Sequence, residues 1–240
     1  NNYLTEMTDI LMENNGTLDK YIGDAIVAFY GAPLDLKDHE LLACRTAIKM
    51  QERLAVLREQ WQEEGERWPE IVHHMQNRIG INTGKMVTGN MGSESRMNYT
   101  MMGDTVNLAA RLESSAKQYG VYIQISDTTY ESVKDQVVVR ALDFVRVMGK
   151  TEPVKVFELI SEKDQEPEQY KKILPVFHEG LGHYFNQDWD KAIEAFKAAD
   201  ELEEMFPGRK TNPSRIYIPR CENFKVNPPG DDWDGVWTQT

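Results

Sequence analysis

Two segments of the sequence combine residue types that could bind a phosphorylated ligand, and the first is Lys20-Tyr21-Ile22-Gly23-Asp24. Glycine permits a tight turn, so the carboxylate of Asp24 can project clear of the neighbouring strands. Hard oxygen ligands of this kind suit Mg²⁺ or Mn²⁺ bound to nucleotide phosphates. Asp24 is therefore a candidate metal ligand. The alternative is an aspartate that fills a turn through hydrogen bonds to its own backbone.

The second segment, residues 99–111 (YTMMGDTVNLAAR), carries two polar residues at helical spacing. Asn107 and Arg111 are four residues apart, so on a helix they share one face and can contact the same ligand. A guanidinium stays charged and offers a planar fork of donors, which suits a phosphate that gains negative charge. The alternative is a surface asparagine beside an arginine that pairs with an acid such as Glu113 or Asp104.

Hydrophobic periodicity predicts the elements that must position these segments. Helices are expected over residues 1–15, 38–64 and 105–119, hairpins over 17–30 and 78–90, and strands over 121–126, 140–147 and 154–160. Glycines 80, 84 and 89 lie in strand-like surroundings, which indicates that the backbone closely approaches another group. This order of elements predicts an α+β fold, a mixed sheet with helices packed on one face.

The C-terminal third has a different character. Residues 161–169 are charged and contain a proline, so we expect a linker there between a domain over 1–160 and an extension over 170–240. Residues 170–206 show two helical patterns. Gly180, Ala192, Phe196 and Ala199 are spaced as in a single tetratricopeptide repeat, which must dock on another surface to bury its apolar face. Trp233 and Trp237 are expected to fix the tail to an apolar surface.

Composition excludes several classes of function. In 240 residues, 27 Lys and Arg oppose 39 Asp and Glu, and the net charge of −12 disfavours a nucleic acid partner. No apolar run is long enough to span a bilayer. The two cysteines lie far apart in the sequence, which favours a reducing environment, and we expect a cytoplasmic catalytic domain.

Lys20-Tyr21-Ile22-Gly23-Asp24-Ala25, Arg78-Ile79-Gly80-Ile81-Asn82-Thr83-Gly84 and residues 99–111 together resemble the catalytic domain of class III nucleotide cyclases, in particular bacterial adenylyl cyclases. The three motifs occur in the order and spacing of that family, and the resemblance covers residues 1–160. It implies a ferredoxin-like α+β fold. The C-terminal third resembles, more weakly, the repeat and tail appended to some bacterial members.

The resemblance also implies catalytic roles for three residues. Asp24 matches one of two aspartates that hold two Mg²⁺ or Mn²⁺ ions per site. Asn107 matches the residue that orients the ribose, and Arg111 matches the arginine that stabilises negative charge on the α-phosphate. The implied reaction converts ATP to 3′,5′-cyclic AMP and pyrophosphate by in-line attack of the ribose 3′-oxygen on the α-phosphorus.

Four further residues match substrate-binding positions. Lys20 and Thr100 match the pair that chooses the base, and a lysine with a threonine at these positions favours ATP over GTP. Arg78 and Lys150 match phosphate-binding positions. The family's lysine can also fall two residues before Lys150, where this sequence has Met148.

The resemblance further implies a head-to-tail homodimer with active sites shared between subunits. The metal aspartates and Arg78 would come from one subunit, and Lys20, Thr100, Asn107, Arg111 and Lys150 from the other. Three alternatives remain open: a guanylyl cyclase, a nucleotide-binding regulatory module without turnover, and an interaction protein dominated by its C-terminal third.

The family's second metal aspartate lies in a strand that precedes the first helix seen here. Asp9 falls within that helix and Asp19 in the following strand, so neither matches it. We expect that the sequence is shortened at its N-terminus, and that a sensor or membrane-anchoring segment could lie upstream. Asp104 is expected to cap the helix that it begins, not to bind metal.

Overall fold

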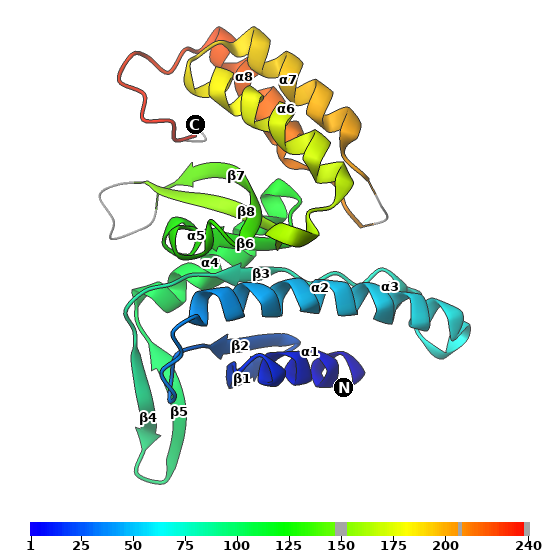
Figure 1. Cartoon of the computed structure of the whole chain (residues 1–240), viewed down its shortest axis with the longest axis vertical. Coiled ribbons are helices and arrows are strands. Elements are labelled where there is room, and N and C mark those ends of the chain that lie inside the picture. Colours follow the sequence, from blue (N-terminus) through cyan, green and yellow to red (C-terminus); the bar gives the residue numbers. More distant parts are fainter. Residues whose placement is uncertain (147–152, 206–207, 238–240) are drawn as a thin grey trace.

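The computed structural model describes residues 1–146, 153–205 and 208–237. Its layers are stacked along one long axis, and helix α2 crosses the middle of the molecule (Figure 1). The helices are α1 (Asn2–Glu13), α2 (His39–Glu63), η1 (Gly65–Arg67), α3 (Glu70–His73), α4 (Asp104–Tyr119), α5 (Asp127–Val133), η2 (Lys163–Gln165), α6 (Glu168–Phe185), α7 (Trp189–Leu202) and α8 (Pro213–Val226). The strands are β1 (Thr17–Ile22), β2 (Ala25–Phe29), β3 (Ile79–Ile81), β4 (Val87–Ser93), β5 (Arg96–Met102), β6 (Ile123–Ser126), β7 (Val137–Val145) and β8 (Val154–Glu162).

The central sheet has four strands in the order β3-β6-β8-β7. Strand β3 runs parallel to β6, whereas β8 is antiparallel to both β6 and β7, so the sheet is mixed. Sheet residues such as Ile125 and Phe157 pack against Leu41 and Ile48 of α2. The predicted α+β fold with a mixed sheet is confirmed.

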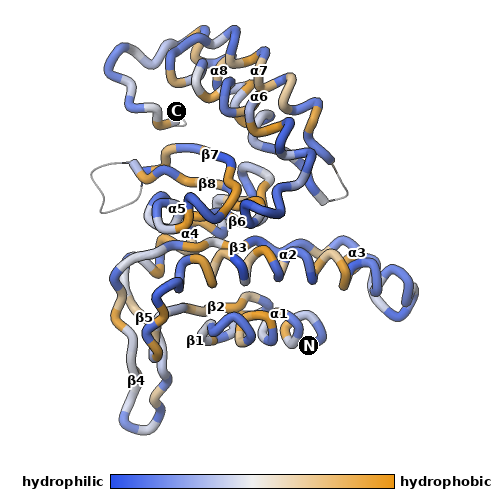
Figure 2. Tube along the Cα trace, viewed as in Figure 1, coloured by the Kyte–Doolittle hydropathy of each residue, from blue (hydrophilic) through white to orange (hydrophobic). Residues whose placement is uncertain are grey.

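Helix α2 separates two cores. One face packs on the sheet, and farther along the helix Leu54 and Leu57 pack against Met7 and Leu11 of α1. Apolar and polar residues alternate along α2, as expected for a helix that buries a stripe of its surface (Figure 2). The predicted helix over 38–64 is therefore confirmed, and that over 1–15 is confirmed with slightly shorter bounds.

Helix α4 lies directly on strand β3 because residue 80 has no side chain. A Cβ atom added to Gly80 would lie 2.2 Å from the carbonyl oxygen of Ala109, a distance that no side chain could occupy. The close backbone approach inferred at Gly80 is therefore to helix α4 of the same chain. Gly84 likewise lies against the side chain of Thr105, whereas nothing lies within 4 Å of a Cβ added at Gly89.

The predicted hairpin over 17–30 is confirmed. Strands β1 and β2 are antiparallel, and Ile22 pairs with Ala25 across a two-residue turn at Gly23 and Asp24. Gly23 has a φ of +64°, a left-handed conformation that glycine adopts without strain. The carboxylate of Asp24 therefore lies at the exposed tip of this hairpin.

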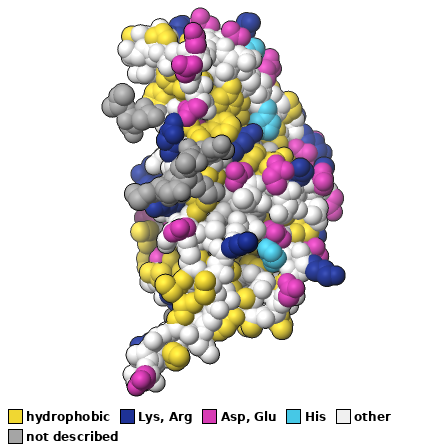
Figure 3. All heavy atoms as spheres, turned by 90° about the vertical axis from the view of Figure 1, so that its left-hand side faces the viewer, with side chains coloured by type: hydrophobic (Ala, Val, Ile, Leu, Met, Phe, Trp, Pro, Cys, Tyr) yellow, Lys and Arg dark blue, Asp and Glu magenta, His cyan; other side chains and the backbone are white. Residues whose placement is uncertain are grey.

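The predicted hairpin over 78–90 is wrong. Strand β3 has no antiparallel partner after it and pairs in parallel with β6. The hairpin is formed by β4 and β5, whose turn pairs Ser93 with Arg96 and contains no glycine. Gly80 and Gly84 lie against helix α4, whereas Gly89 makes no such contact, so the close approach inferred for all three holds for the first two. The β4–β5 hairpin projects from the molecule and exposes the hydrophobic residues Val87, Met97 and Met102 (Figures 1 and 3).

Three α-helices were missed by the sequence analysis, the shortest of which is α3, Glu70–His73. Helix α5 begins after Ser126, whose side chain accepts a hydrogen bond from the backbone of Thr129. Helix α8 begins with Pro213 after Asn212, whose side chain accepts from the backbone N–H of Arg215 at 3.1 Å. Asparagine followed by proline is a helix-start signal, but Pro219 inside the helix obscures it. Strand β7 also begins earlier than predicted, at Val137.

Helices α6, α7 and α8 form a further hydrophobic core that is rich in aromatic residues. Phe177, Tyr184, Phe196 and Tyr217 are fully buried within it. Gly180 allows close contact with the ring of Phe196, since an added Cβ would lie 2.8 Å from that ring. Ring contacts of Trp233 with Tyr184 and of Trp237 with Phe224 hold the tail on this core, at 5.1 and 5.0 Å between ring centroids. The domain bounds and the repeat resemblance stay predictions.

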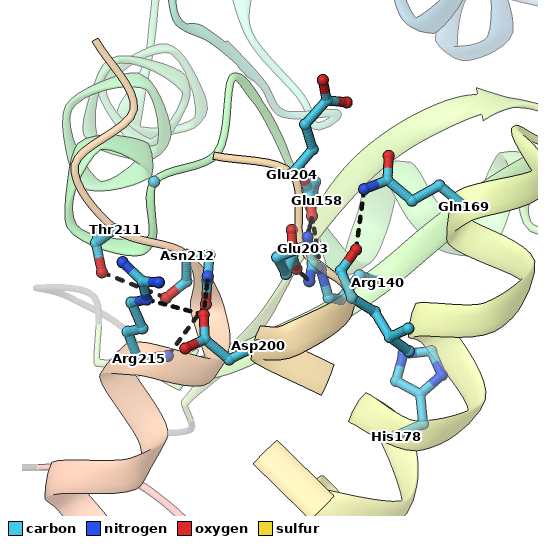
Figure 4. Close-up of polar contacts among 12 residues, drawn as sticks. Arg140, Glu158, Gln169, His178, Asp200, Glu203, Glu204, Thr211, Asn212 and Arg215 are labelled. Carbon is cyan, nitrogen blue, oxygen red and sulfur yellow. Dashed lines mark hydrogen bonds and ion pairs between the residues drawn. The ribbon is translucent and has the colours of Figure 1, made fainter. Parts of the chain in front are cut away.

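Two buried ionic networks attach this three-helix extension to the sheet. In the first, Arg140 of β7 pairs with Glu158 of β8 at 2.7 Å and with Glu203 just after α7 (Figure 4). Burial raises the pKa of the Glu158 carboxyl, and the Arg140 guanidinium opposes that rise. Because these charged groups are buried, each depends on its ionic partners for the stabilisation that water would otherwise supply.

The second network joins the extension to α4. Arg220 of α8 donates to Asp143 of β7 at 2.6 Å, and the Tyr119 hydroxyl at the end of α4 donates to the same carboxylate at 2.7 Å. The side chain of Asp143 is only 3 % exposed. One carboxylate thus links α4, β7 and α8.

In the part of the chain that the structure describes, no helix is long and apolar enough to cross a membrane. Cys44 and Cys221 are both free and buried.

Replacing Arg220 should test the second network. The change Arg220→Met keeps most of the side-chain bulk but leaves the buried Asp143 without its cation, so we expect the free energy of unfolding to fall by about 3 kcal/mol. Urea denaturation followed by circular dichroism would measure the loss.

The matched control lies on the same helix. Lys225 of α8 pairs with the exposed Asp190, and Lys225→Met should change the unfolding free energy by less than about 1 kcal/mol. Equal losses in the two variants would contradict the assignment of Asp143 and Arg220 as a buried pair that holds the extension.

Candidate active site

The predicted base-choosing residues meet between two hairpins. Lys20 of β1 and Thr100 of β5 are 80 positions apart in the sequence, yet the Lys20 Nζ atom lies 3.4 Å from the Thr100 Oγ1 atom. The Lys20 side chain is half exposed. The pair therefore presents an ammonium group and a hydroxyl oxygen side by side at the surface. This arrangement suits a heterocyclic base that carries both a hydrogen-bond acceptor and a hydrogen-bond donor.

A residue that the sequence analysis set aside joins this pair. The Thr100 hydroxyl donates to the Asp19 carboxylate at 2.9 Å, and Lys20 lies 3.4 Å from the same Oδ2 atom. Only 3 % of the Asp19 side chain is exposed. The position of Asp19 next to Lys20 did not predict this contact, because adjacent residues of a regular strand point to opposite faces.

Asp24 stands apart from these residues at the exposed tip of the β1–β2 hairpin. It lies close enough to the start of α1 to act on Tyr3: burial raises the pKa of the Tyr3 hydroxyl, and the negative charge of Asp24 adds to that rise. Across residues 1–146, 153–205 and 208–237, no three His, Cys, Asp or Glu residues are grouped so as to hold a metal ion.

A lone carboxylate still fits one mode of magnesium binding. Mg²⁺ is commonly bound by one or two carboxylates together with the phosphates of the substrate, and it keeps several waters. Asp24 could supply one such oxygen ligand at the hairpin tip. The chemistry of this donor set fits a divalent ion that arrives with a nucleotide and does not fit a metal site built from protein ligands alone.

Helix α4 presents Asn107 and Arg111 on its exposed face. Leu108 and Leu112 follow them directly and are buried against the sheet. This one-residue offset turns the polar pair toward solvent while the leucines anchor the helix. Arg111 lines a shallow surface hollow of about 390 Å³ with Ala110, Ser114, Ser115 and Gln118.

Hydrogen bonds to the loop after β3 fix the position of α4. At its start, the side chain of Asn82 donates to the carbonyl oxygen of Thr105 at 2.9 Å, and the Thr105 hydroxyl donates to the carbonyl oxygen of Lys85 at 2.9 Å. The expected cap by Asp104 is wrong: it is the first residue of α4, Gly103 precedes it, and no side-chain hydrogen bond caps the helix. The loop after β3 replaces that cap as the anchor.

Arg78 directly precedes β3 and pairs with a residue of α4. Its Nε atom lies 3.3 Å from Glu113, two positions beyond Arg111, and both side chains are more than a third exposed. Glu113 was considered as a partner of Arg111 and is instead a partner of Arg78. Lys150, together with Met148, lies outside the described residues.

The structure thus brings some of the predicted residues together. Lys20 and Thr100 are in contact, Asn107 and Arg111 share a helix face, and Arg78 reaches that helix through Glu113. Asp24 is separate, at the end of a different element.

Comparison with known proteins identifies the family. The adenylate and guanylate cyclase catalytic domain matches residues 1–161, about two thirds of the sequence. The chain belongs to this family. The adenylate cyclase "terminal-differentiation specific" of Dictyostelium discoideum is 34 % identical over 231 residues, which are 94 % of this chain and 10 % of that protein. Adenylate cyclase 1 of Rhizobium meliloti is 32 % identical over 158 residues, 66 % of this chain and 23 % of that protein.

Solved structures extend the comparison to the fold. The adenylyl cyclase CyaB from P. aeruginosa superposes with a TM-score of 0.60 at 34 % identity, covering 69 % of this chain and 82 % of that chain. The guanylyl cyclase Cya2 superposes with a TM-score of 0.57, also at 34 % identity, covering 68 % and 79 %. The cyclase fold is therefore common to adenylyl and guanylyl cyclases, and the fold alone does not decide the base. The chain spans only a small part of the curated relatives it matches.

The Arg78–Glu113 pair predicts an effect on phosphate affinity. Because Glu113 competes for the Arg78 guanidinium, Glu113→Gln should free it and lower the Kd for inorganic tripolyphosphate by about two- to fivefold, the range of an exposed ion pair. Isothermal titration calorimetry would measure the Kd.

The control removes the same charge elsewhere. Glu131 of α5 pairs with Lys134 at 2.7 Å, so Glu131→Gln matches the change in net charge and should leave the Kd as in the wild type. If both variants bind tripolyphosphate equally, Arg78 is not a phosphate ligand restrained by Glu113.

Proposed function

We propose that this cyclase domain is an adenylyl cyclase, which converts ATP to 3′,5′-cyclic AMP and pyrophosphate. The observation that carries the proposal is the contact of Lys20 with Thr100. An ammonium group can donate to the N1 atom of adenine, and a hydroxyl oxygen can accept from its exocyclic amine. The named adenylate cyclases among its relatives add support.

The exposed residues of α4 fit the reaction at the α-phosphate. Arg111 would donate to the phosphate oxygens as negative charge builds on them, and Asn107, on the same helix face, would orient the ribose. Arg78 would bind the polyphosphate. These groups position the ribose 3′-oxygen in line with the α-phosphorus, and phosphoryl chemistry of this kind needs positioning and charge stabilisation more than covalent catalysis.

Divalent metal would be held in part by Asp24. When bound, Mg²⁺ or Mn²⁺ supplies charge neutralisation at the phosphates. Asp24 contributes one carboxylate oxygen at the exposed hairpin tip.

We also propose that the active site is shared by two protomers arranged head to tail. Asp24 lies on a different element from Asn107 and Arg111, so a second copy of the chain offers a way to bring both groups to one nucleotide. Exposed hydrophobic residues on the projecting β4–β5 hairpin, Val87, Met97 and Met102, are between 59 and 66 % exposed and suit burial against such a copy (Figure 3). Each dimer would then have two equivalent sites.

Loss of Arg111 tests the catalytic proposal. Arg111→Ala should lower kcat for ATP by about 100- to 1,000-fold, the cost of removing one donor that acts on the transition state, with a smaller change in KM. The assay measures cyclic AMP formed from ATP with Mn²⁺. Arg67→Ala changes an exposed arginine on η1 and serves as the control, which should keep wild-type turnover. Wild-type protein that turns over GTP and not ATP would refute the proposed substrate.

Mixing inactive variants tests the shared site. Asp24→Ala and Arg111→Ala affect opposite halves of each site, so a re-equilibrated equal mixture should recover about a quarter of wild-type activity, because half the dimers carry one intact site. Asn107→Ala mixed with Arg111→Ala affects the same half and should recover none. If the first mixture stays as inactive as the second, the shared-site proposal is wrong.

A further inference from the structure

A β-bulge in strand β1 brings two adjacent side chains to one target. Leu18 pairs with Ala28 and Lys20 with Val27, so Asp19 has no partner residue on β2. Side chains alternate between faces in a regular strand, and a bulge interrupts this alternation and redirects a side chain. As a result, Asp19 and Lys20 both reach Thr100.

The Asp19 carboxylate determines which way the Thr100 hydroxyl points. An ionised carboxylate only accepts hydrogen bonds, so at 2.9 Å the hydroxyl must donate its single proton to Asp19. Lys20, an obligate donor, faces the same hydroxyl oxygen at 3.4 Å. The hydroxyl therefore has no proton left for a ligand, and its remaining lone pair makes Thr100 solely an acceptor.

From this geometry we propose that Asp19 is a positioning residue for base selection, which holds Thr100 as an acceptor and thereby selects adenine over guanine. The inference rests on the proposed function, in which Lys20 and Thr100 contact the base. Asp19 itself touches no substrate, because its carboxylate is almost fully buried behind the two residues that would.

The chemistry of the two bases explains the selection. Adenine presents an acceptor at N1 and a donor amine at position 6, which complement the donor Lys20 and the acceptor Thr100. Guanine presents the reverse, an N1–H donor and an O6 acceptor, so in the same pose both contacts would be mismatched. A Thr100 hydroxyl released from Asp19 could rotate and donate to O6, which removes one of these mismatches.

The test compares affinities for 3′-deoxy-ATP and 3′-deoxy-GTP, which lack the attacking oxygen and report binding without turnover. Calorimetry on the whole 240-residue chain would give the ratio of the two Kd values for the wild type, Asp19→Ala, Thr100→Val and the double variant. We expect the wild type to prefer the adenine nucleotide. Asp19→Ala should reduce that preference about five- to tenfold, the value of one hydrogen bond.

The double variant separates positioning from a general structural role. Once Thr100→Val has removed the hydroxyl, Asp19→Ala should not lower the preference further. Asp19→Asn keeps the shape of the side chain and serves if the alanine variant does not fold: its amide can donate to Thr100 and free the hydroxyl proton, so the preference should also fall. Asp9→Asn on α1 removes an exposed carboxylate and should leave the preference unchanged.

Several results would overturn the inference. One is that Asp19→Ala weakens the binding of both nucleotides equally. Another is that it lowers the preference for the adenine nucleotide as much with Thr100→Val as without it. A wild type that binds neither nucleotide, or that prefers guanine, would also refute it. Failure of the proposed function is distinguishable: protein that prefers 3′-deoxy-ATP but makes no cyclic AMP from ATP loses the proposed reaction and retains the base selection.

Discussion

The direct contact of helix α4 with strand β3 is the constraint on which the candidate site depends. Gly80 lets the strand lie against the helix backbone, where a side chain would not fit. The helix is buried through Leu108 and Leu112, and the residues directly before them, Asn107 and Arg111, are exposed to solvent. The same packing puts the start of β3 beside the helix, so Arg78 reaches Glu113. A backbone contact thus sets where three predicted phosphate- and ribose-binding residues lie.

The C-terminal extension acts on the other end of that helix. Tyr119 shares the Asp143 carboxylate with Arg220, and Arg209 donates to the carbonyl oxygen of Gly120 at 3.2 Å. Because these charges are buried, the extension and α4 cannot separate without exposing unpaired ionic groups. The extension is therefore joined to the helix that carries Arg111, and this connection gives it a physical route to affect the orientation of the site.

Sequence patterns predicted the parts of this fold that local periodicity controls. The apolar stripes of α2 and α4 and the Gly23–Asp24 turn reflect local physics, and their bounds were close to those observed. The partner strand of β3 was not predictable in this way, since Gly80 is needed for contact with a helix that is distant in sequence. Asp19 was overlooked for a similar reason: its role depends on a bulge and on Thr100, 81 positions away. Residues that act through non-local contacts leave little local signal.

In the proposed dimer, one protomer holds the base and the α-phosphate while a second supplies the metal-binding carboxylate. A crystal structure of the chain with an unreactive ATP analogue and Mn²⁺ would test it most directly. We expect adenine within hydrogen-bond distance of Lys20 and Thr100, the α-phosphate at Arg111 of the same protomer, and Asp24 of the other protomer at the metal. A nucleotide held entirely by one chain, or bound away from Lys20, would contradict it.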